Sequence, residues 1–148
     1  MADNKSLTHR WFEEVWNQGK ESTINELLGS NIVAFGLGEG GTEVHGKQEF
    51  KQFFDNLRNA FPDIHITIED TIAERDEVVV RIVIEGTHKG NGLGVAATGK
   101  KIRLAGICII QFANGKLIKG WNSWDQLGMF QQLGLTPVPK SDPFLEAR

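Results

Sequence analysis

The sequence is short of several residue types, with no tyrosine, one cysteine and four prolines among its 148 residues. The lack of tyrosine excludes every mechanism that needs a phenol. The lone Cys108 excludes an internal disulfide, which fits a reducing compartment. The 16 basic and 19 acidic residues give a net charge of −3. That small charge offers no electrostatic reason to expect nucleic acid or an anionic membrane as a partner.

Long apolar runs are missing as well. The run Ala105–Ile110 is far too short to cross a bilayer, and the polar N-terminus lacks the apolar stretch of a secretory signal. With 40% hydrophobic and 24% charged residues, the composition is typical of a globular protein, and the length suits one domain. We therefore expect a single cytoplasmic domain spanning residues 1–148.

The first half of the chain has the apolar spacing of helices. Leu7, Trp11 and Val15 recur every four residues and predict a helix over 5–18. Similar patterns predict helices over 22–28 and 48–60, with a short strand at 31–35 and a glycine-rich loop at 36–46 between them.

After Pro62 the apolar period changes to two, which is typical of half-buried strands. We predict strands over 64–69, 78–86, 102–112 and 117–124. Asn114-Gly115 between the last two predicts a tight hairpin. Helices first and strands afterwards indicate an α+β fold in which helices pack on one face of a curved antiparallel sheet.

Several familiar motifs fail on inspection. The segment 36–41 matches the G-x-G-x-x-G pattern of dinucleotide sites, but no helix opens at its third glycine. The four histidines are too scattered for a metal site, so we expect no metal. Cys108 lies in the middle of an apolar strand and is interpreted as an inert core thiol.

The end of the last strand is more informative. Trp121, Ser123 and Asp125 alternate and should share one strand face. Pairing Phe112 with Leu117 across the hairpin predicts three further pairs: Cys108–Trp121, Gly106–Ser123 and Leu104–Asp125. This register places the Asp125 carboxylate on an apolar face. Such surroundings raise the pKa of a carboxyl group and suit a general acid/base.

Asp125 also has a purely structural interpretation. It directly precedes the apolar segment 126–130, and aspartate is a favoured N-cap residue of helices. A capping carboxylate accepts backbone N–H bonds, which lower its pKa and make it a poor base. The residues alone leave both roles open.

The chain resembles the SnoaL-like polyketide cyclases of the nuclear-transport-factor-two-like superfamily. The matching stretches occur in the expected order over nearly the whole chain: 11–19 (WFEEVWNQG), 60–64 (AFPDI), 86–90 (GTHKG), 98–100 (TGK) and 121–134 (WNSWDQLGMFQQLG). The resemblance implies a conical α+β barrel with three N-terminal helices on the concave face of its sheet. It also implies a deep apolar cavity, a homodimer and no cofactor.

The characterised relatives close a ring by intramolecular aldol condensation of a polyketide. The resemblance therefore implies Asp125 as the acid/base and a small apolar or polyketide-like substrate. We expect Trp121, Ser123, Phe61 and His88 to contact that substrate. His88 shares its strand face with buried isoleucines, although a solvated hairpin position is equally open.

Related activities of the same fold are partly excluded. Ketosteroid isomerase and scytalone dehydratase types rely on tyrosine, which this chain lacks. Limonene epoxide hydrolase types need an Asp-Arg-Asp set, but the residue two positions after Arg103 is Ala105 rather than an aspartate. Two other functions remain: a binding protein for a small apolar ligand, and an assembly module that uses the outer sheet face. The proline-containing arm 135–148 is expected to lie on the body or on a partner subunit.

Overall fold

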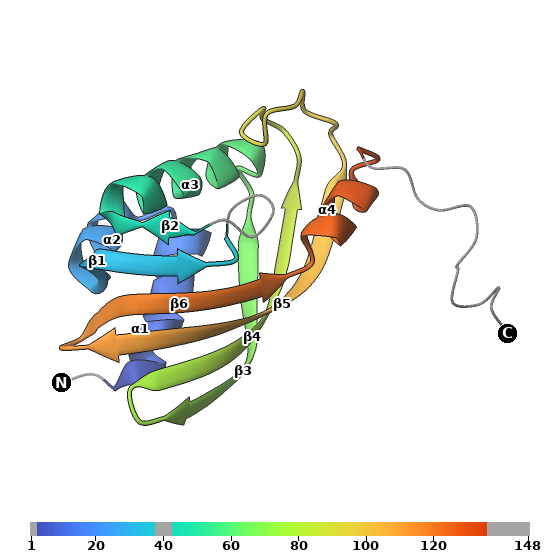
Figure 1. Cartoon of the computed structure of the whole chain (residues 1–148). Helices are drawn as coiled ribbons and strands as arrows, with labels where there is room; N and C mark the ends of the chain where they lie inside the picture. The colour runs from blue at the N-terminus through green and yellow to red at the C-terminus, as the bar shows by residue number, and fades with distance from the viewer. Residues whose placement is uncertain (1–2, 38–42, 136–148) are drawn as a thin grey trace, which may run out of the picture.

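The computed structural model describes residues 3–37 and 43–135 (Figure 1). Helical segments and strands follow in this order: α1 (Asn4–Arg10), the π-helical η1 (Trp11–Asn17), α2 (Glu21–Leu27), β1 (Leu28–Phe35), β2 (Val44–His45), α3 (Gly46–Ala60), β3 (His65–Glu74), β4 (Glu77–Thr87), β5 (Lys101–Ala113), β6 (Lys116–Trp124) and α4 (Gln126–Gln132). Most of the predicted arm, residues 136–148, lies outside the described residues, as does 38–42 of the glycine-rich loop.

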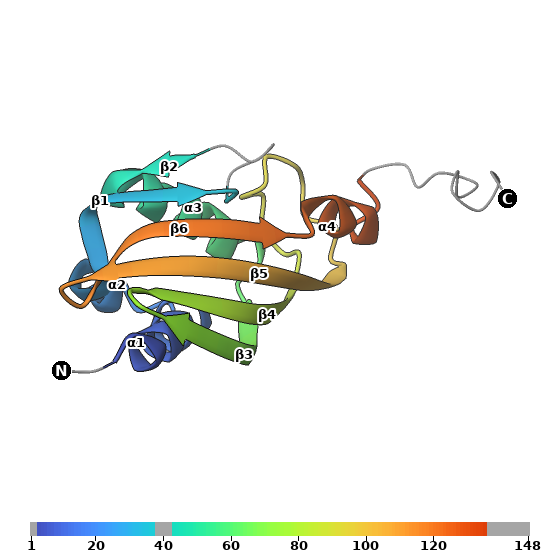
Figure 2. The ribbon, with the colours of Figure 1, turned by 60° about the horizontal axis from the view of Figure 1, so that its bottom comes forward.

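The six strands form one mixed sheet in the order β2-β1-β6-β5-β4-β3 (Figure 2). The pairs β3–β4, β4–β5, β5–β6 and β1–β2 are antiparallel, whereas β1 runs parallel to β6. The sheet is open among the described residues, because β2 and β3 form its two ends. The α+β prediction is confirmed, but the expected closed barrel of antiparallel strands is not.

The helices before the long strands cover one face of the sheet (Figures 1 and 2). The predicted first helix is α1 continued by η1, whose wider winding buries Trp11, Phe12, Val15 and Trp16 together. The described residues thus hold four α-helices and a π-helix, so the expectation of three N-terminal helices is not confirmed. None of the described helices is long and apolar enough to span a membrane.

The core lies between this helical layer and the sheet. Aromatic side chains from η1 and α3 meet there, with the Trp16 ring 5.3 Å from Phe54 and the Trp11 ring 5.4 Å from Phe50. The strands supply every second residue, and on β4 the inward residues Val80, Ile82 and Ile84 are buried. The predicted burial of this face of β4 is therefore confirmed, although Val83 of the opposite face is buried as well.

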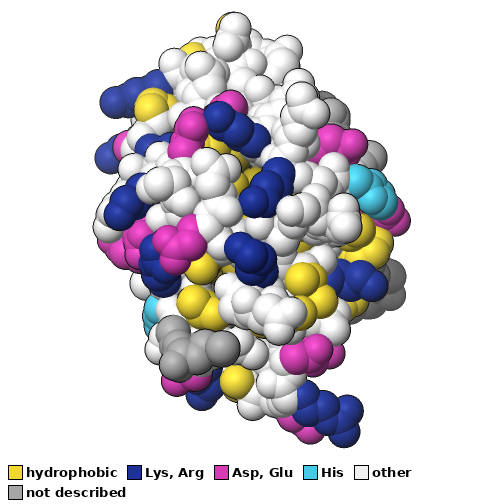
Figure 3. All heavy atoms as spheres, turned by 90° about the vertical axis from the view of Figure 1, so that its left-hand side faces the viewer, with side chains coloured by type: hydrophobic (Ala, Val, Ile, Leu, Met, Phe, Trp, Pro, Cys, Tyr) yellow, Lys and Arg dark blue, Asp and Glu magenta, His cyan; other side chains and the backbone are white. Residues whose placement is uncertain are grey.

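Charged side chains surround this core. At the end of the molecule where β1 begins, basic and acidic side chains are interspersed over the surface (Figure 3). Arg10 of α1 binds both Glu14 of η1 and Glu26 of α2, which ties the three helical segments together. Arg10 and Glu14 are half-buried and Glu26 is exposed, so water screens these pairs and their contribution to stability is small.

Candidate functional site

A cavity opens between α3, the connection 88–100 and α4. We call it the mouth, and its volume is about 190 Å³. Its lining is mainly apolar, with two amide side chains among the residues: Leu37, Phe53, Asn56, Leu57, Gly92, Leu93, Trp124, Gln126, Met129 and Phe130. An apolar hollow with a few polar groups is the usual form of a small-molecule site.

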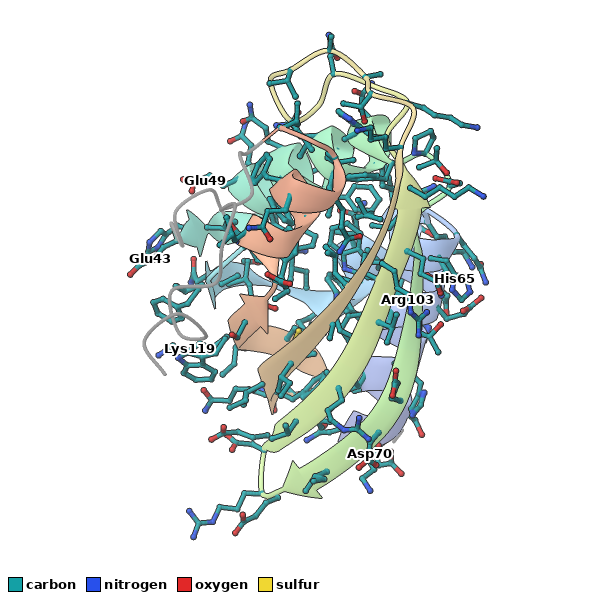
Figure 4. The ribbon with its side chains drawn as sticks, turned by 90° about the vertical axis from the view of Figure 1, so that its right-hand side faces the viewer. Glu43, Glu49, His65, Asp70, Arg103 and Lys119 are labelled. Atoms are coloured by element: carbon teal, nitrogen blue, oxygen red, sulfur yellow. The ribbon has the colours of Figure 1, made fainter. Side chains whose placement is uncertain are left out.

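Two smaller compartments adjoin the mouth in the space between the sheet and the helices, which side chains otherwise fill (Figure 4). The inner compartment has a volume of about 50 Å³ and shares five lining residues with the mouth: Leu37, Phe53, Leu57, Trp124 and Met129. The far compartment, of about 60 Å³, shares Phe12, Trp16, Leu37 and Asn122 with the inner one. The three therefore form one apolar slot under the sheet.

The connection 88–100 forms one side of the mouth and is held against α3 by close backbone packing. The N–H groups of Lys89 and Gly90 donate to the Ala60 carbonyl at 2.9 and 3.3 Å, at the end of α3. A Cβ on Gly92 would stand 1.9 Å from the Asn56 carbonyl oxygen. Only a residue without a side chain lets the connection 88–100 lie this close to the helix.

Lys119 lines the far compartment, and the other polar groups that line the slot among the described residues are neutral. The Asn122 amide donates to the Phe35 carbonyl at 2.9 Å, and the buried Trp124 Nε1 has no hydrogen-bond acceptor among the described residues. None of the described residues that line the three compartments carries a carboxylate or an imidazole. No group of three His, Cys, Asp or Glu within 3–37 and 43–135 is placed to hold a metal ion.

Cys108 lines the inner compartment and is itself buried. Burial raises the pKa of its thiol to about 12 from an ordinary 9.0, because the thiolate is poorly stabilised away from water. At neutral pH the group stays protonated and therefore acts as a small apolar side chain.

The hairpin register differs from the prediction by one residue. Phe112 does pair with Leu117, but a β-bulge at Ile118 makes Gln111 pair with Lys119. Beyond the bulge the pairs are Cys108–Asn122, Ile107–Ser123 and Gly106–Trp124. Because side chains alternate along a strand, one extra residue exchanges the two faces.

The shift moves Trp121 and Ser123 to the outer face of the sheet. Both side chains are exposed, and the Trp121 ring stacks on Phe35 with centroids 6.0 Å apart. The prediction that they share the face of Cys108 and Gly106 is therefore wrong. Asn122 and Trp124, for which no role was expected, line the slot instead. No local signal in the sequence marks them, because only the register decides which residues point inward.

Asp125 lies at the junction of β6 and α4 and is exposed. Its carboxylate accepts the backbone N–H of Gly128 at 2.8 Å, so it caps α4 as the structural interpretation expects. The side chain borders a shallow depression on the outer face together with Arg81 and Ile107. The prediction that the Asp125 carboxylate lies in apolar surroundings opposite Leu104 is therefore wrong. The backbone of Asp125 nevertheless lies between Trp124 and Gln126, which both line the mouth.

His88 is completely buried, so the solvated position is excluded. Its Nδ1 accepts the backbone N–H of Thr98 at 3.1 Å, which places the proton of the neutral ring on Nε2. That Nε2 has no partner among the described residues. The ring packs on Phe61 with centroids 5.6 Å apart. Phe61 lines the inner compartment, so His88 stands behind its wall.

The chain is similar to known proteins over most of its length. A family model described as SnoaL-like polyketide cyclase matches residues 6–133. Aklanonic acid methyl ester cyclase DnrD of Streptomyces peucetius is 30% identical over 137 residues, which cover 90% of this chain and 92% of DnrD. DauD of Streptomyces sp. (strain C5), which bears the same enzyme name, is also 30% identical over 137 residues, covering 90% of this chain and 83% of DauD. A solved structure from Jannaschia sp. CCS1 superposes with a TM-score of 0.81 at 23% identity, covering 90% of this chain and 93% of that one.

Proposed function

We propose that this chain, which belongs to the SnoaL-like polyketide cyclase family, closes a ring in a polyketide-like substrate bound in its slot. The observation that carries the proposal is the slot itself, an apolar hollow whose mouth measures about 190 Å³. No charged side chain among the described residues lines its mouth or its inner compartment. Such a lining favours a largely apolar, uncharged substrate, because burying a charge there without a partner is costly. The names of the curated relatives support a polyketide ester as that substrate.

The proposed chemistry is an intramolecular aldol addition. A base removes a proton from a carbon next to one carbonyl group, and the resulting enolate carbon forms a bond to a second carbonyl carbon. The second oxygen becomes an alkoxide and takes up a proton, so the product is an isomer of the substrate. The slot contributes by holding one flexible molecule folded so that its two reacting carbons meet.

We propose Asp125 as the acid/base of this reaction. Its backbone lies between two residues of the mouth, Trp124 and Gln126, while its carboxylate caps α4. Giving up one capping bond costs about 1 kcal/mol, which substrate binding readily offsets. The carboxylate then turns from Gly128 to the mouth, removes the carbon-bound proton and later returns it to the alkoxide.

The test is conversion of aklanonic acid methyl ester, followed by chromatography for an isomer of unchanged mass. A second assay follows deuterium exchange at the methyl group of 2-acetonaphthone in D₂O, which reports enolisation alone. Asp125→Asn keeps the cap but cannot accept a proton, and it should lower both rates by roughly 100- to 10,000-fold. Asp3→Asn is the matched control, since Asp3 caps α1 through the Ser6 N–H at 2.8 Å. Full activity of Asp125→Asn would overturn the role of Asp125.

A non-catalytic binding protein is the second candidate. It is favoured by one observation: Asp125 is exposed and engaged as a cap, while the described lining of the slot holds no carboxylate. Under this alternative the protein binds 2-acetonaphthone but accelerates neither reaction. Binding without turnover of either compound would therefore replace the enzyme proposal with the carrier.

A further inference from the structure

The indole of Trp124 is the one buried N–H that borders both the mouth and the inner compartment without a hydrogen-bond acceptor among the described residues. Trp124 ends β6, and the bulge at Ile118 turns it inward, on the same strand face as Asn122. A buried N–H that lacks an acceptor is unfavourable. Tryptophan donates and never accepts through this nitrogen, so its acceptor comes from a molecule in the slot, either water or a ligand that displaces it.

The cross-strand neighbour of Trp124 leaves space for the ring. Gly106 pairs with Trp124, and a Cβ on Gly106 would lie 3.0 Å from the Trp124 Cβ and 3.4 Å from Cγ1 of Ile82. Glycine at this position therefore lets the tryptophan stand close to β5 with its indole over the slot. The position of the Trp124 indole N–H is therefore fixed by packing between β5 and β6 rather than by a loop.

The surroundings define which acceptor fits. The described residues that line the mouth and the inner compartment include no lysine, arginine, histidine, aspartate or glutamate. An anionic acceptor would be buried there without a counter-charge, which is strongly unfavourable. A ketone, ester or quinone oxygen carries no net charge, accepts one N–H bond and belongs to a molecule that is otherwise apolar.

We propose that the Trp124 indole N–H binds a carbonyl oxygen of the ligand at the junction of the mouth and the inner compartment, and so selects carbonyl-bearing polycyclic molecules. The inference rests on ligand binding in the slot, as the proposed function does, but is independent of catalysis by Asp125. In a cyclising substrate the same bond strengthens as negative charge develops on that oxygen during loss of the neighbouring proton.

The experiment compares two ligands of nearly the same shape, 2-acetonaphthone and 2-isopropenylnaphthalene, in which a CH₂ group replaces the ketone oxygen. Binding of each is measured by calorimetry. The four tryptophan indole N–H resonances of ¹⁵N-labelled protein are followed by NMR. Trp124→Phe removes the donor and keeps an aromatic ring. Trp121→Phe is the matched control, because Trp121 lies on the outer face of the same strand.

We expect the wild-type protein to bind the ketone about 2- to 12-fold more tightly than the alkene, the usual worth of one net hydrogen bond. The Trp124 resonance should move downfield with the ketone only. Trp124→Phe should abolish the preference, and Trp121→Phe should keep it. The resonance of the wild-type protein decides the matter even if Trp124→Phe does not fold.

Two failures are distinguishable. If both ligands bind equally and the Trp124 resonance responds to neither or to both alike, the indole is not a carbonyl donor, whereas the slot and the proposed function stand. If neither ligand binds, the slot is not a site for apolar carbonyl compounds, and the proposed function fails together with this inference.

Discussion

A methyl group added at Gly92 should disturb the mouth more than the fold. The Cβ of Gly92→Ala would stand 1.9 Å from the Asn56 carbonyl oxygen, 2.9 Å from its carbon and 3.1 Å from the Ala60 nitrogen. All three are backbone atoms of α3, so no side chain can rotate away. The connection 88–100 must move off the helix by more than about 1 Å to restore ordinary contact distances of roughly 3.5 Å.

The expected magnitude follows from this overlap. Overpacking of this kind typically costs 1–3 kcal/mol, which corresponds to a melting temperature lower by roughly 2–12 °C for a chain of this length. Gly92 and Leu93 both line the mouth. Their displacement should therefore also weaken the binding of 2-acetonaphthone.

Gly94→Ala is the control on the same connection. Gly94 has a φ of +84°, but a Cβ there meets nothing within 4 Å. This variant should therefore lose only about 1 kcal/mol to backbone strain and keep its affinity. Stability is measured by urea denaturation and affinity by calorimetry. A Gly92→Ala protein with wild-type stability and affinity would refute the docking of this connection on α3.

Three further outcomes are expected. Asp125→Ala should lower the unfolding free energy by about 1 kcal/mol and Asp125→Asn by much less, if the observed cap at α4 contributes as caps usually do; equal urea midpoints for both variants would contradict this. Burial raises the pKa of Cys108 to about 12, so the unfolded chain loses this proton at lower pH than the folded protein. Stability should then fall between about pH 9 and 12, by at most about 1.4 kcal/mol per pH unit, and Cys108→Ala should flatten that slope. Ile107 and Trp121 are 49% and 36% exposed on the outer sheet face, and we propose a homodimer through this face. Light scattering should then give the mass of two chains at micromolar concentration, and Ile107→Lys should lower that mass. A monomeric mass of the wild-type protein would count against the dimer.

The local pattern of the last hairpin could be predicted, but its consequence for the site could not. Asn114 and Gly115 have φ values of +53° and +76°, as a two-residue hairpin turn requires, and Phe112 pairs with Leu117 as expected. The bulge at Ile118 then moves the side chain of every later β6 residue to the face opposite the one predicted. A bulge inserts one residue without a characteristic sequence, so alternation alone assigned the wrong residues to the slot.

The burial of single side chains was easier to predict than the pairing of strands that lie far apart in the sequence. Phe61 lines the inner compartment, and His88 is buried behind it, which is one of the two positions that the sequence left open for His88. The parallel pairing of β1 with β6 joins segments more than 80 residues apart, as Val33 opposite Lys119 illustrates. Propensity and apolar period are local properties, and neither specifies which distant strand a segment joins.

The sheet order also sets when the molecule becomes complete during synthesis. Among the described residues, β1 joins the long strands only through β6, which is also the last of the described strands to leave the ribosome. Until residues 116–124 emerge, β1 and its short partner β2 have no sheet to join, and the apolar faces of η1 and α3 have only part of their cover. Pairing across such a sequence separation is slow, because a long loop must close first. We therefore expect folding of this chain to be a late event that depends on β6, and nascent chains released before Lys116 to be the species most in need of a chaperone.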